Sequence, residues 1–363
     1  MQKGIPYLFW SGILLTGCSI PIDPESFDYQ RSVVVDGSVT DEFKQHEVSI
    51  QYSTPISGEQ AQSLTATVWI ETGKGEIINY HRQLDTYISD EPFEGKTGES
   101  YQLHFILENG EAFESAPSQL IKAPKIDRIY NRYAELAPEG AAQNEGGIQF
   151  FLDAHDETET AQYFRYEWIE DYKIITPNIA FDLYVFPTGI IDKPFPTHIC
   201  YARDQSKSTI IGNSIETGGR IAEFPIRFIS STTDILRNRY CILVRQYAID
   251  VNTYNFYSRF KKLNETTGSL FDKQVGSIPG NIYSLTDPDE VVLGYFEAAG
   301  VSEKRVFYDF EELDPAFPRP EYRGNCGPEW EFITSYDMNP AIGSWGRDLD
   351  VIGYYLGSPS YPI

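Results

Sequence analysis

Residues 101–110, Tyr-Gln-Leu-His-Phe-Ile-Leu-Glu-Asn-Gly, alternate apolar and polar side chains and then end in an Asn-Gly pair. Alternation with a period of two places the apolar side chains on one face, which is typical of a half-buried β-strand. Asn109 and Gly110 both accept positive φ, so this pair predicts a tight hairpin turn. The stretch therefore indicates antiparallel β-structure.

Similar strand patterns occur earlier in the chain. Residues 32–35, Ser-Val-Val-Val, are mostly β-branched, and apolar side chains alternate with polar ones in 46–52 and 64–70. No helical period interrupts these segments, and turn signals separate them. Several short strands at such spacing predict that residues 31–120 form a β-sandwich resembling the immunoglobulin or transthyretin type.

The remainder, residues 121–363, is predicted to be a larger β-rich domain. Strands are expected at 148–152 and 163–168, joined by the acidic segment 153–159. Four carboxylates around His155 invite comparison with a calcium loop, but the fixed ligand offsets and the turn glycine of such a loop are absent. We interpret the segment as a solvated hairpin turn and expect no metal site.

Three further features organise the second domain. Tyr240–Ile249 is apolar on nearly every position, which predicts a buried central strand. Val291–Ala298 and Lys304–Phe310 are predicted to be two strands joined by Ala299-Gly300-Val301. The proline-punctuated segment Thr176–Thr197 is either a flap that faces a partner or a cover for the end of a sheet, and the sequence leaves both readings open.

One short amphipathic helix is expected near residues 253–265. Tyr254, Phe256, Tyr257 and Phe260 lie on roughly one stripe at helical spacing, which is more typical of a packed face than of a binding site. Asn252 or Thr253 is the expected N-cap, because side chains of this type accept hydrogen bonds from the first helical amides.

The N-terminal residues 1–17 have the features of a secretory signal, with Lys3 before an apolar run that ends at Leu15-Thr16-Gly17-Cys18. An aliphatic Leu15 and a small Gly17 before a cysteine are what a lipoprotein signal peptidase recognises. We expect lipidation of Cys18, with Leu15, Thr16 and Gly17 as the recognition residues. Each buried methylene contributes about 0.8 kcal/mol of membrane affinity, so two or more acyl chains anchor a protein stably.

Residues 18–30 are predicted to be a tether between the lipid and the first sandwich, because Pro21, Pro24 and several acids give this segment no periodicity. The sequence has no second apolar run of membrane-spanning length. The lipid anchor is therefore the expected membrane attachment.

Cysteine use fits the same location. Lipidation of Cys18 leaves three of the four cysteines: Cys200, Cys241 and Cys326. Cys241 lies in the predicted buried strand and is expected to act as a small hydrophobic residue. Cys200 and Cys326 lie in loop-like sequence, so a disulfide between them is possible in an oxidising compartment.

The chain is strongly acidic, with a formal net charge of −24 and a pI of about 4.5. Loss of Lys3 with the signal changes the net charge to −25. A surface of this sign repels phosphate backbones, which excludes nucleic acid as an expected partner.

Catalytic motifs are not evident in the sequence. The chain has no G-x-S-x-G elbow, no phosphate-binding loop that ends in Gly-Lys-Ser/Thr and no C-x-x-C pair. We therefore expect a protein that is not an enzyme and that needs no cofactor. Paired carboxylates of the glycosidase kind are one chemistry that sequence alone does not exclude, because such pairs converge in space.

Several short motifs together resemble a known family. They are Val33-Val34-Val35-Asp36-Gly37 with Thr40-Asp41, Gly280-Asn281-Ile282, and Val292-Leu293-Gly294-Tyr295-Phe296 with Lys304-Arg305, in addition to the segment ending at Cys18. With these motifs the chain resembles an uncharacterised family of Bacteroidota outer-membrane lipoproteins, a domain of unknown function. Members are commonly encoded beside TonB-dependent transporters of the SusC kind.

The resemblance implies an outer-membrane location, facing the cell exterior, and a role beside a transporter. Our leading hypothesis is a non-catalytic accessory or ligand-binding lipoprotein that works with a SusC-like TonB-dependent transporter. The alternatives are a surface hydrolase of glycan or peptide that uses paired carboxylates, and a structural or adhesive surface module. The ligand is not indicated by the sequence.

Overall fold

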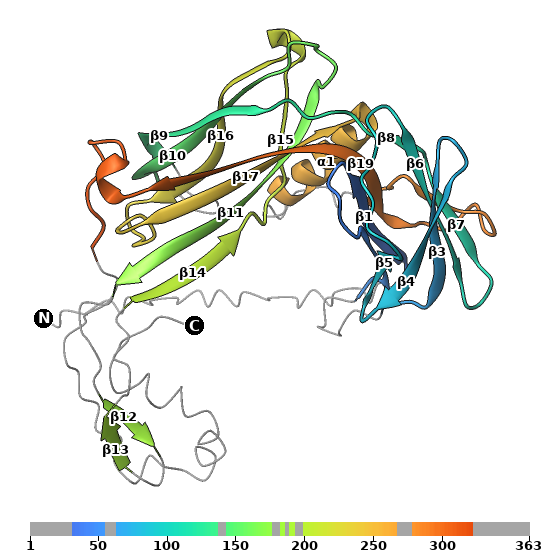
Figure 1. The fold of residues 1–363 in the computed structure, drawn as a ribbon, viewed down its shortest axis with the longest axis horizontal. Helices are drawn as coiled ribbons and strands as arrows, with labels where there is room; N and C mark the ends of the chain where they lie inside the picture. Colours follow the sequence, from blue (N-terminus) through green and yellow to red (C-terminus); the bar gives the residue numbers. More distant parts are fainter. Residues whose placement is uncertain are drawn as a thin grey trace, which may run out of the picture.

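The computed structural model describes residues 31–54, 63–136, 143–175, 182–185, 189–192, 199–266 and 278–321. The described chain is mainly β, with one α-helix and two short 3-10 turns. Figure 1 shows two β-rich halves side by side, with the N-terminal strands in blue and the later strands in green to orange. The predicted fold class is thereby confirmed.

The first strands along the chain are β1 (Val33–Thr40), β2 (Glu47–Tyr52), β3 (Ala66–Thr72), β4 (Ile77–Gln83), β5 (Thr86–Ser89), β6 (Ser100–Leu107), β7 (Ala112–Ser115) and β8 (Ser118–Gln119). The predicted hairpin at Asn109-Gly110 is confirmed, because β6 pairs antiparallel with β7 and Gly110 has a φ of 89°. Alternate side chains of β6 are buried, as the period of two requires.

The later strands are β9 (Ile126–Leu136), β10 (Glu145–His155), β11 (Tyr163–Ile175), β12 (Asp182–Val185), β13 (Gly189–Asp192), β14 (Ile199–Gln205), β15 (Ile210–Asn213), β16 (Arg220–Ser230), β17 (Tyr240–Ile249), β18 (Ile282–Ser284) and β19 (Leu293–Tyr308). The helical segments are α1 (Val251–Thr266), η1 (Ile215–Thr217) and η2 (Phe310–Glu312). The predicted central strand is confirmed: β17 lies between β11 and β19, and Cys241 on it is buried.

A single long sheet runs through both halves in the order β14-β11-β17-β19-β1-β2-β5-β4-β3-β6-β7-β18. Its N-terminal part curls into a sandwich around a core that includes Val35, Leu103 and Phe105. Ile282 and Phe296 belong to the same core. The first sandwich is thus completed by β18 and the beginning of β19, which come from late in the chain.

β19 connects the two halves. Its first part, Leu293–Ala299, pairs parallel with β1, and its second part, Gly300–Tyr308, pairs antiparallel with β17. The prediction of two strands joined by a turn at Ala299-Gly300-Val301 is therefore wrong. Gly300 does not form a turn. It lies close to another backbone segment, because a Cβ at this position would be 2.3 Å from the carbonyl oxygen of Ile121. Glycine lets the crossing segment approach the strand closely.

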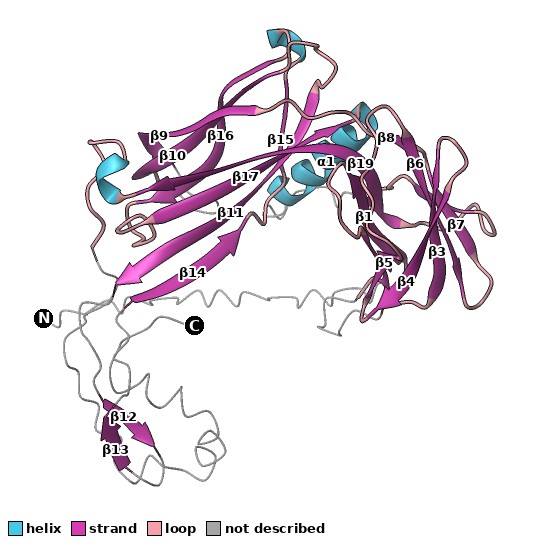
Figure 2. Ribbon diagram, in the orientation of Figure 1, coloured by secondary structure: helices cyan, strands magenta, loops and turns pink. Residues whose placement is uncertain are grey.

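The second half is a sandwich of this sheet with a three-stranded sheet, β16-β10-β9. Figure 2 shows the small sheet lying over β11 and β17. Aromatic side chains fill the space between the layers, and the ring centroids of Phe150 and Tyr240 are 5.2 Å apart.

The acidic connection 156–162 joins two different sheets. β10 pairs with β9 and β16, whereas β11 pairs with β14, β15 and β17, so the predicted hairpin between these two strands is not formed. Residues 157–159 of the predicted turn are exposed, as expected, but Asp156 is not. Asp156 is buried, and its carboxylate accepts hydrogen bonds from the Thr158 and Ala161 amides. The carboxylate therefore organises a crossover between layers.

The predicted helix is confirmed as α1, but its cap is two positions before the nearer of the two expected caps. Asp250 Oδ1 accepts hydrogen bonds of 2.8 Å from the amides of Asn252 and Thr253. Asp250 is thus the N-cap in place of Asn252 or Thr253. The helix packs through Tyr254 and Tyr257 against the outer face of β11, β17 and β19.

Candidate functional site

Most of the family motifs within the described residues meet at one place, the pairing of β1 with the first part of β19. Gly294 opposes Val35 in the register and has a φ of 92°. A Cβ on Gly294 would lie 1.8 Å from the Val35 carbonyl oxygen, and one on Gly280 would lie 1.8 Å from the Gly294 carbonyl oxygen. Three backbone segments therefore approach so closely that glycine is required at two of them.

Asn281 completes this joint. Its side-chain oxygen accepts a hydrogen bond of 2.9 Å from the Phe296 amide, and its side-chain nitrogen donates one of 2.7 Å to the Phe296 carbonyl. Its own carbonyl accepts from the Ala116 amide. Farther along, the Val301 amide donates to the Asp41 carboxylate over 2.7 Å. These motif residues fix the first part of β19 in the first sandwich, which is a structural role.

A network of charged side chains lies on the outer face of the sheet next to this joint. Arg165 on β11 donates to Glu297 on β19 over 2.6 Å and also pairs with Glu167. Its guanidinium lies 4.1 Å from the ring centroid of Tyr247. The Tyr247 hydroxyl donates to Glu167 over 2.8 Å. Arg165 is thereby held by two carboxylates and an aromatic face.

The two carboxylates of this network differ in environment. Burial raises the pKa of Glu297, and the attraction of Arg165 only partly offsets this. Burial also acts to raise the pKa of Glu167, but Arg165 and the hydrogen bond from Tyr247 outweigh it, so that pKa is lowered. The Glu297 side chain is only 4% exposed. A substrate in solvent therefore does not reach it, and the arrangement serves to join β11 to β19.

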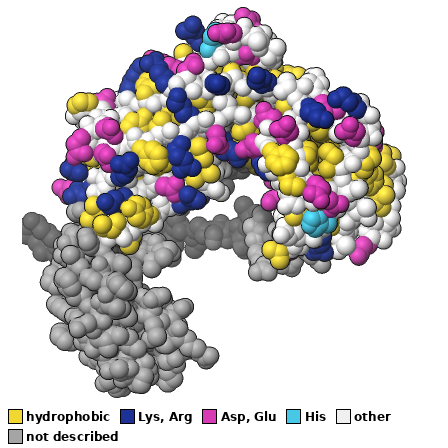
Figure 3. Space-filling view, in the orientation of Figure 1, with side chains coloured by type: hydrophobic (Ala, Val, Ile, Leu, Met, Phe, Trp, Pro, Cys, Tyr) yellow, Lys and Arg dark blue, Asp and Glu magenta, His cyan; other side chains and the backbone are white. Residues whose placement is uncertain are grey.

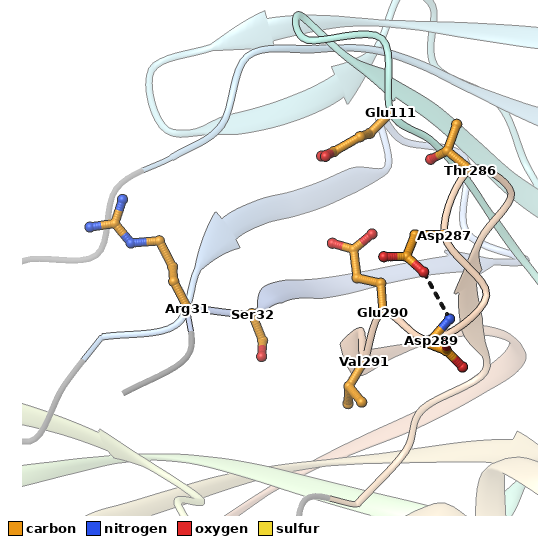
Figure 4. Close-up of a pocket in the computed structure, with 8 residues that line it drawn as sticks. All are labelled: Arg31, Ser32, Glu111, Thr286, Asp287, Asp289, Glu290 and Val291. Atoms are coloured by element: carbon orange, nitrogen blue, oxygen red, sulfur yellow. Dashed lines mark hydrogen bonds between the residues drawn. The ribbon is translucent and has the colours of Figure 1, made fainter. Parts of the chain in front are cut away.

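A cavity of about 650 Å³ lies at the other end of β1, lined by Arg31, Ser32, Glu111, Thr286, Asp287, Asp289, Glu290 and Val291. Figure 4 shows Glu111 and the 286–291 loop on one side and Arg31 on the other. Burial raises the pKa of Glu290, and the nearby carboxylates of Glu111 and Asp287 raise it further. The cavity is thus acidic, which favours positively charged groups.

This cavity escaped the sequence analysis because its residues come from three distant segments. The parallel pairing of β1 with β19 brings Arg31 next to the loop between β18 and β19, and Glu111 comes from the β6–β7 turn. Only the position of Arg31, directly after the predicted tether, links the cavity to a sequence feature.

The residues singled out in the sequence are distributed as follows. Leu15, Thr16, Gly17, Cys18 and Cys326 lie outside the described residues. Cys200 lies on β14, exposed and with a free thiol, so its pairing with Cys326 stays a prediction. The segment Thr176–Thr197 is described only at β12 and β13. Within the described ranges, no group of three or more His, Cys, Asp or Glu residues could hold a metal ion.

The described surface is hollowed between the two halves, and Figure 3 shows acidic and basic side chains interspersed over it. Among the described helices, none is long and apolar enough to cross a membrane. Fold and surface together define a β-rich protein of two sandwiches that share one strand.

The chain belongs to the family described as Domain of unknown function (DUF4249), whose model matches residues 19–305. No curated protein matches the chain. The crystal structure of a DUF4785 family protein from Legionella pneumophila is similar over 58% of this chain, at 9% identity and a TM-score of 0.18. The similarity covers 51% of that protein, so this chain spans about half of its length. A similarity this weak carries no argument about function.

Proposed function

We propose that the protein is a lipoprotein, anchored in the outer membrane through Cys18 and facing the cell exterior. In this proposal it acts without catalysis, as an accessory or ligand-binding partner of a SusC-like TonB-dependent transporter. The observation that carries the proposal is the sequence Leu15-Thr16-Gly17-Cys18 after an apolar run. The transporter is proposed as the partner because the chain resembles outer-membrane lipoproteins that are encoded beside such transporters.

The position of the acidic cavity supports this proposal. A tether of residues 18–30 would span at most about 45 Å when fully extended, at roughly 3.5 Å per residue. Arg31 lines the cavity, so the cavity lies where the tether joins the first sandwich. It is therefore close enough to the bilayer to contact the outer loops of a membrane protein, and its charge favours a basic partner surface.

The buried charged network favours a binding role over the hydrolase alternative. Glycoside hydrolysis needs two carboxylates that both contact the substrate. Within this network, Glu167 and Glu297 are neighbouring carboxylates whose pKa values are shifted in opposite directions, and Glu297 is buried against Arg165. Their bonds join strands of the body and do not line a substrate cleft.

The test is purification of the tagged protein from its own membranes in mild detergent. We expect a TonB-dependent transporter to co-purify with it. We expect the double variant Asp287→Lys, Glu290→Lys to lose most of the transporter, because it reverses the charge of the cavity. Glu157→Lys, at an exposed position in the other half, is the matched control and should retain it. Recovery of the lipoprotein alone from wild-type membranes would refute the proposal.

A further inference from the structure

The hairpin between β4 and β5 has an unusual residue at its tip. Leu84 has a φ of 55° and is 89% exposed. Left-handed backbone is strained for a residue with a branched apolar side chain, and a hairpin tip ordinarily uses Asn, Asp or Gly there. An exposed leucine also buries little apolar surface, so it adds little to the stability of the folded chain. The fold of the hairpin therefore does not explain a leucine at this position.

The side chain of Arg82 holds the tip in place. Its Nε donates a hydrogen bond of 3.1 Å to the Leu84 carbonyl, and its Nη1 donates one of 2.9 Å to the Thr65 hydroxyl. The guanidinium thus ties the tip to a neighbouring segment of the first sandwich. Because the backbone of the tip is fixed in this way, a contact made through Leu84 has to order only one side chain, which keeps the entropic cost of binding small.

The tip lies at the same end of the first sandwich as the acidic cavity. Arg82 also donates to the Ser63 hydroxyl over 3.4 Å, and Ser63 forms a bridge with Gln51 at the end of β2. β2 pairs antiparallel with β1, so the end of β2 lies beside the start of β1. Arg31, just before β1, lines the cavity. Figure 1 shows β4 ending at the lower end of the N-terminal half, where β5 begins.

This end of the sandwich combines exposed apolar side chains with negative charge. Val291 lines the cavity and is 47% exposed, and Leu285, just before the cavity loop, is 55% exposed. The carboxylates that line the cavity are those of Glu111, Asp287, Asp289 and Glu290. Negative charge of this kind repels anionic lipid head groups and attracts basic protein surfaces. The chemistry therefore favours a protein partner over a bilayer.

We propose that this end of the first sandwich is a docking surface and that Leu84 is its apolar anchor beside the acidic cavity. The partner has an apolar pocket that takes the leucine side chain, bordered by Lys and Arg residues that face the cavity. The inference rests on the proposed function, because it takes the partner to be the outer surface of the transporter. The strained leucine is then explained, since strain is retained where a contact requires it.

The test compares stability with binding in Leu84→Asn. Asparagine adopts left-handed backbone more readily than leucine, so we expect the melting temperature to rise by about 1–3 °C. The transporter that co-purifies with the wild-type protein is purified and titrated in detergent against each immobilised variant. We expect Leu84→Asn to bind it at least about tenfold more weakly, because it removes an apolar anchor. A purely structural role of Leu84 would not raise stability while it lowers affinity.

Phe43→Asn is the matched control. Phe43 is 73% exposed and belongs to the same half, but it follows β1 and so lies at the opposite end of that strand from Arg31. It should bind the transporter as the wild-type protein does. Salt of about 0.5 M should weaken binding of all three proteins, whereas the ratio of affinities between wild type and Leu84→Asn should persist, because salt does not screen an apolar contact.

The outcomes separate this inference from the proposed function. If the wild-type protein recovers no transporter, the proposed function fails and the docking surface fails with it. If the wild-type protein recovers the transporter and Leu84→Asn binds it equally well, only the docking inference is wrong. A wild-type dimer that becomes a monomer in Leu84→Asn, measured by analytical ultracentrifugation, would show that a second copy occupies this end and would also overturn the inference.

Discussion

Arg245 on β17 and Glu42, which follows β1, form an ion pair in which Nη2 is 2.5 Å from both carboxylate oxygens. The two residues are 203 positions apart in the sequence. Their contact lies where β19 passes from one sandwich to the other, beside the bond from the Val301 amide to Asp41. The two halves are therefore joined by a shared strand and by side chains across the joint.

Removal of Arg165 should destabilise the protein strongly. Arg165→Ala leaves Glu297 buried without its cationic partner, and breaking a buried pair in this way typically costs about 3–5 kcal/mol. Urea unfolding at neutral pH measures the free energy of unfolding. The matched control is Arg128→Ala, whose partner is Asp153 and whose side chain is 65% exposed, and it should change stability little. Equal losses of unfolding free energy in the two variants would show that the buried pair contributes no more to stability than the exposed one.

Substitution of Gly294 tests the joint between β1 and β19. Gly294→Ala adds a methyl group 1.8 Å from the Val35 carbonyl oxygen and strains a backbone with a φ of 92°. We expect a loss of about 3 kcal/mol, from strain and overpacking together. Gly110→Ala is the matched control, because Gly110 has a φ of 89° and nothing within 4 Å of its added Cβ. It should lose only the strain, about 1–2 kcal/mol. Thermal unfolding that ranks Gly110→Ala as the worse variant would contradict the close approach.

The N-cap can be tested by two neighbouring substitutions. Asp250→Ala removes the acceptor for the first helical amides and should cost about 1 kcal/mol. Asn252→Ala, two positions later on an exposed side of α1, should have almost no effect. Hydrogen exchange of the first turn of α1 should accelerate only in Asp250→Ala. Acceleration in Asn252→Ala instead would restore the cap expected from the sequence.

His46 should make stability depend on pH. Burial lowers the pKa of this side chain to about 4, and its Nδ1 has no hydrogen-bond partner, whereas Nε2 contacts the Phe93 carbonyl over 3.1 Å. Because the pKa is lower in the folded state, the contribution of His46 is complete above about pH 6.5 and is lost as the pH falls towards 4. The loss is about 3 kcal/mol.

The measurement is the free energy of unfolding between pH 7 and pH 4. His46→Gln should remove this part of the pH dependence, whereas His81→Gln, at an exposed position beside Asp90, should retain it. An unchanged pH profile in His46→Gln would show that His46 does not titrate in this range.

Local periodicity predicted much of the fold and little of the candidate site. Alternation identified β6, and the apolar run identified β17, because each pattern depends on which face of one strand is buried. Pairing over long distances leaves no such local pattern. Gly300 was read as a turn, since a glycine suits both a turn and a close backbone approach, and only the position of Ile121 distinguishes them.

The acidic cavity could not be predicted from the sequence for the same reason, because it depends on strand pairing over long distances. Glu111 and Asp287 are ordinary turn residues in the sequence, and they lie together because β18 pairs with β7 while β19 pairs with β1. Asp250 escaped for a local reason. Asn252 and Thr253, which follow within three positions, are capping residue types as well, and only the hydrogen bonds from the helical amides identify Asp250 as the cap.

The most direct test of the proposed function is intact mass spectrometry of the protein extracted from its own membranes. We predict a mature chain that begins at Cys18, with a diacylglyceryl thioether on its sulfur and an acyl group on its amine. A chain that retains residues 1–17, or one with an unmodified thiol at Cys18, would contradict the membrane anchor and, with it, the proposed role beside a transporter.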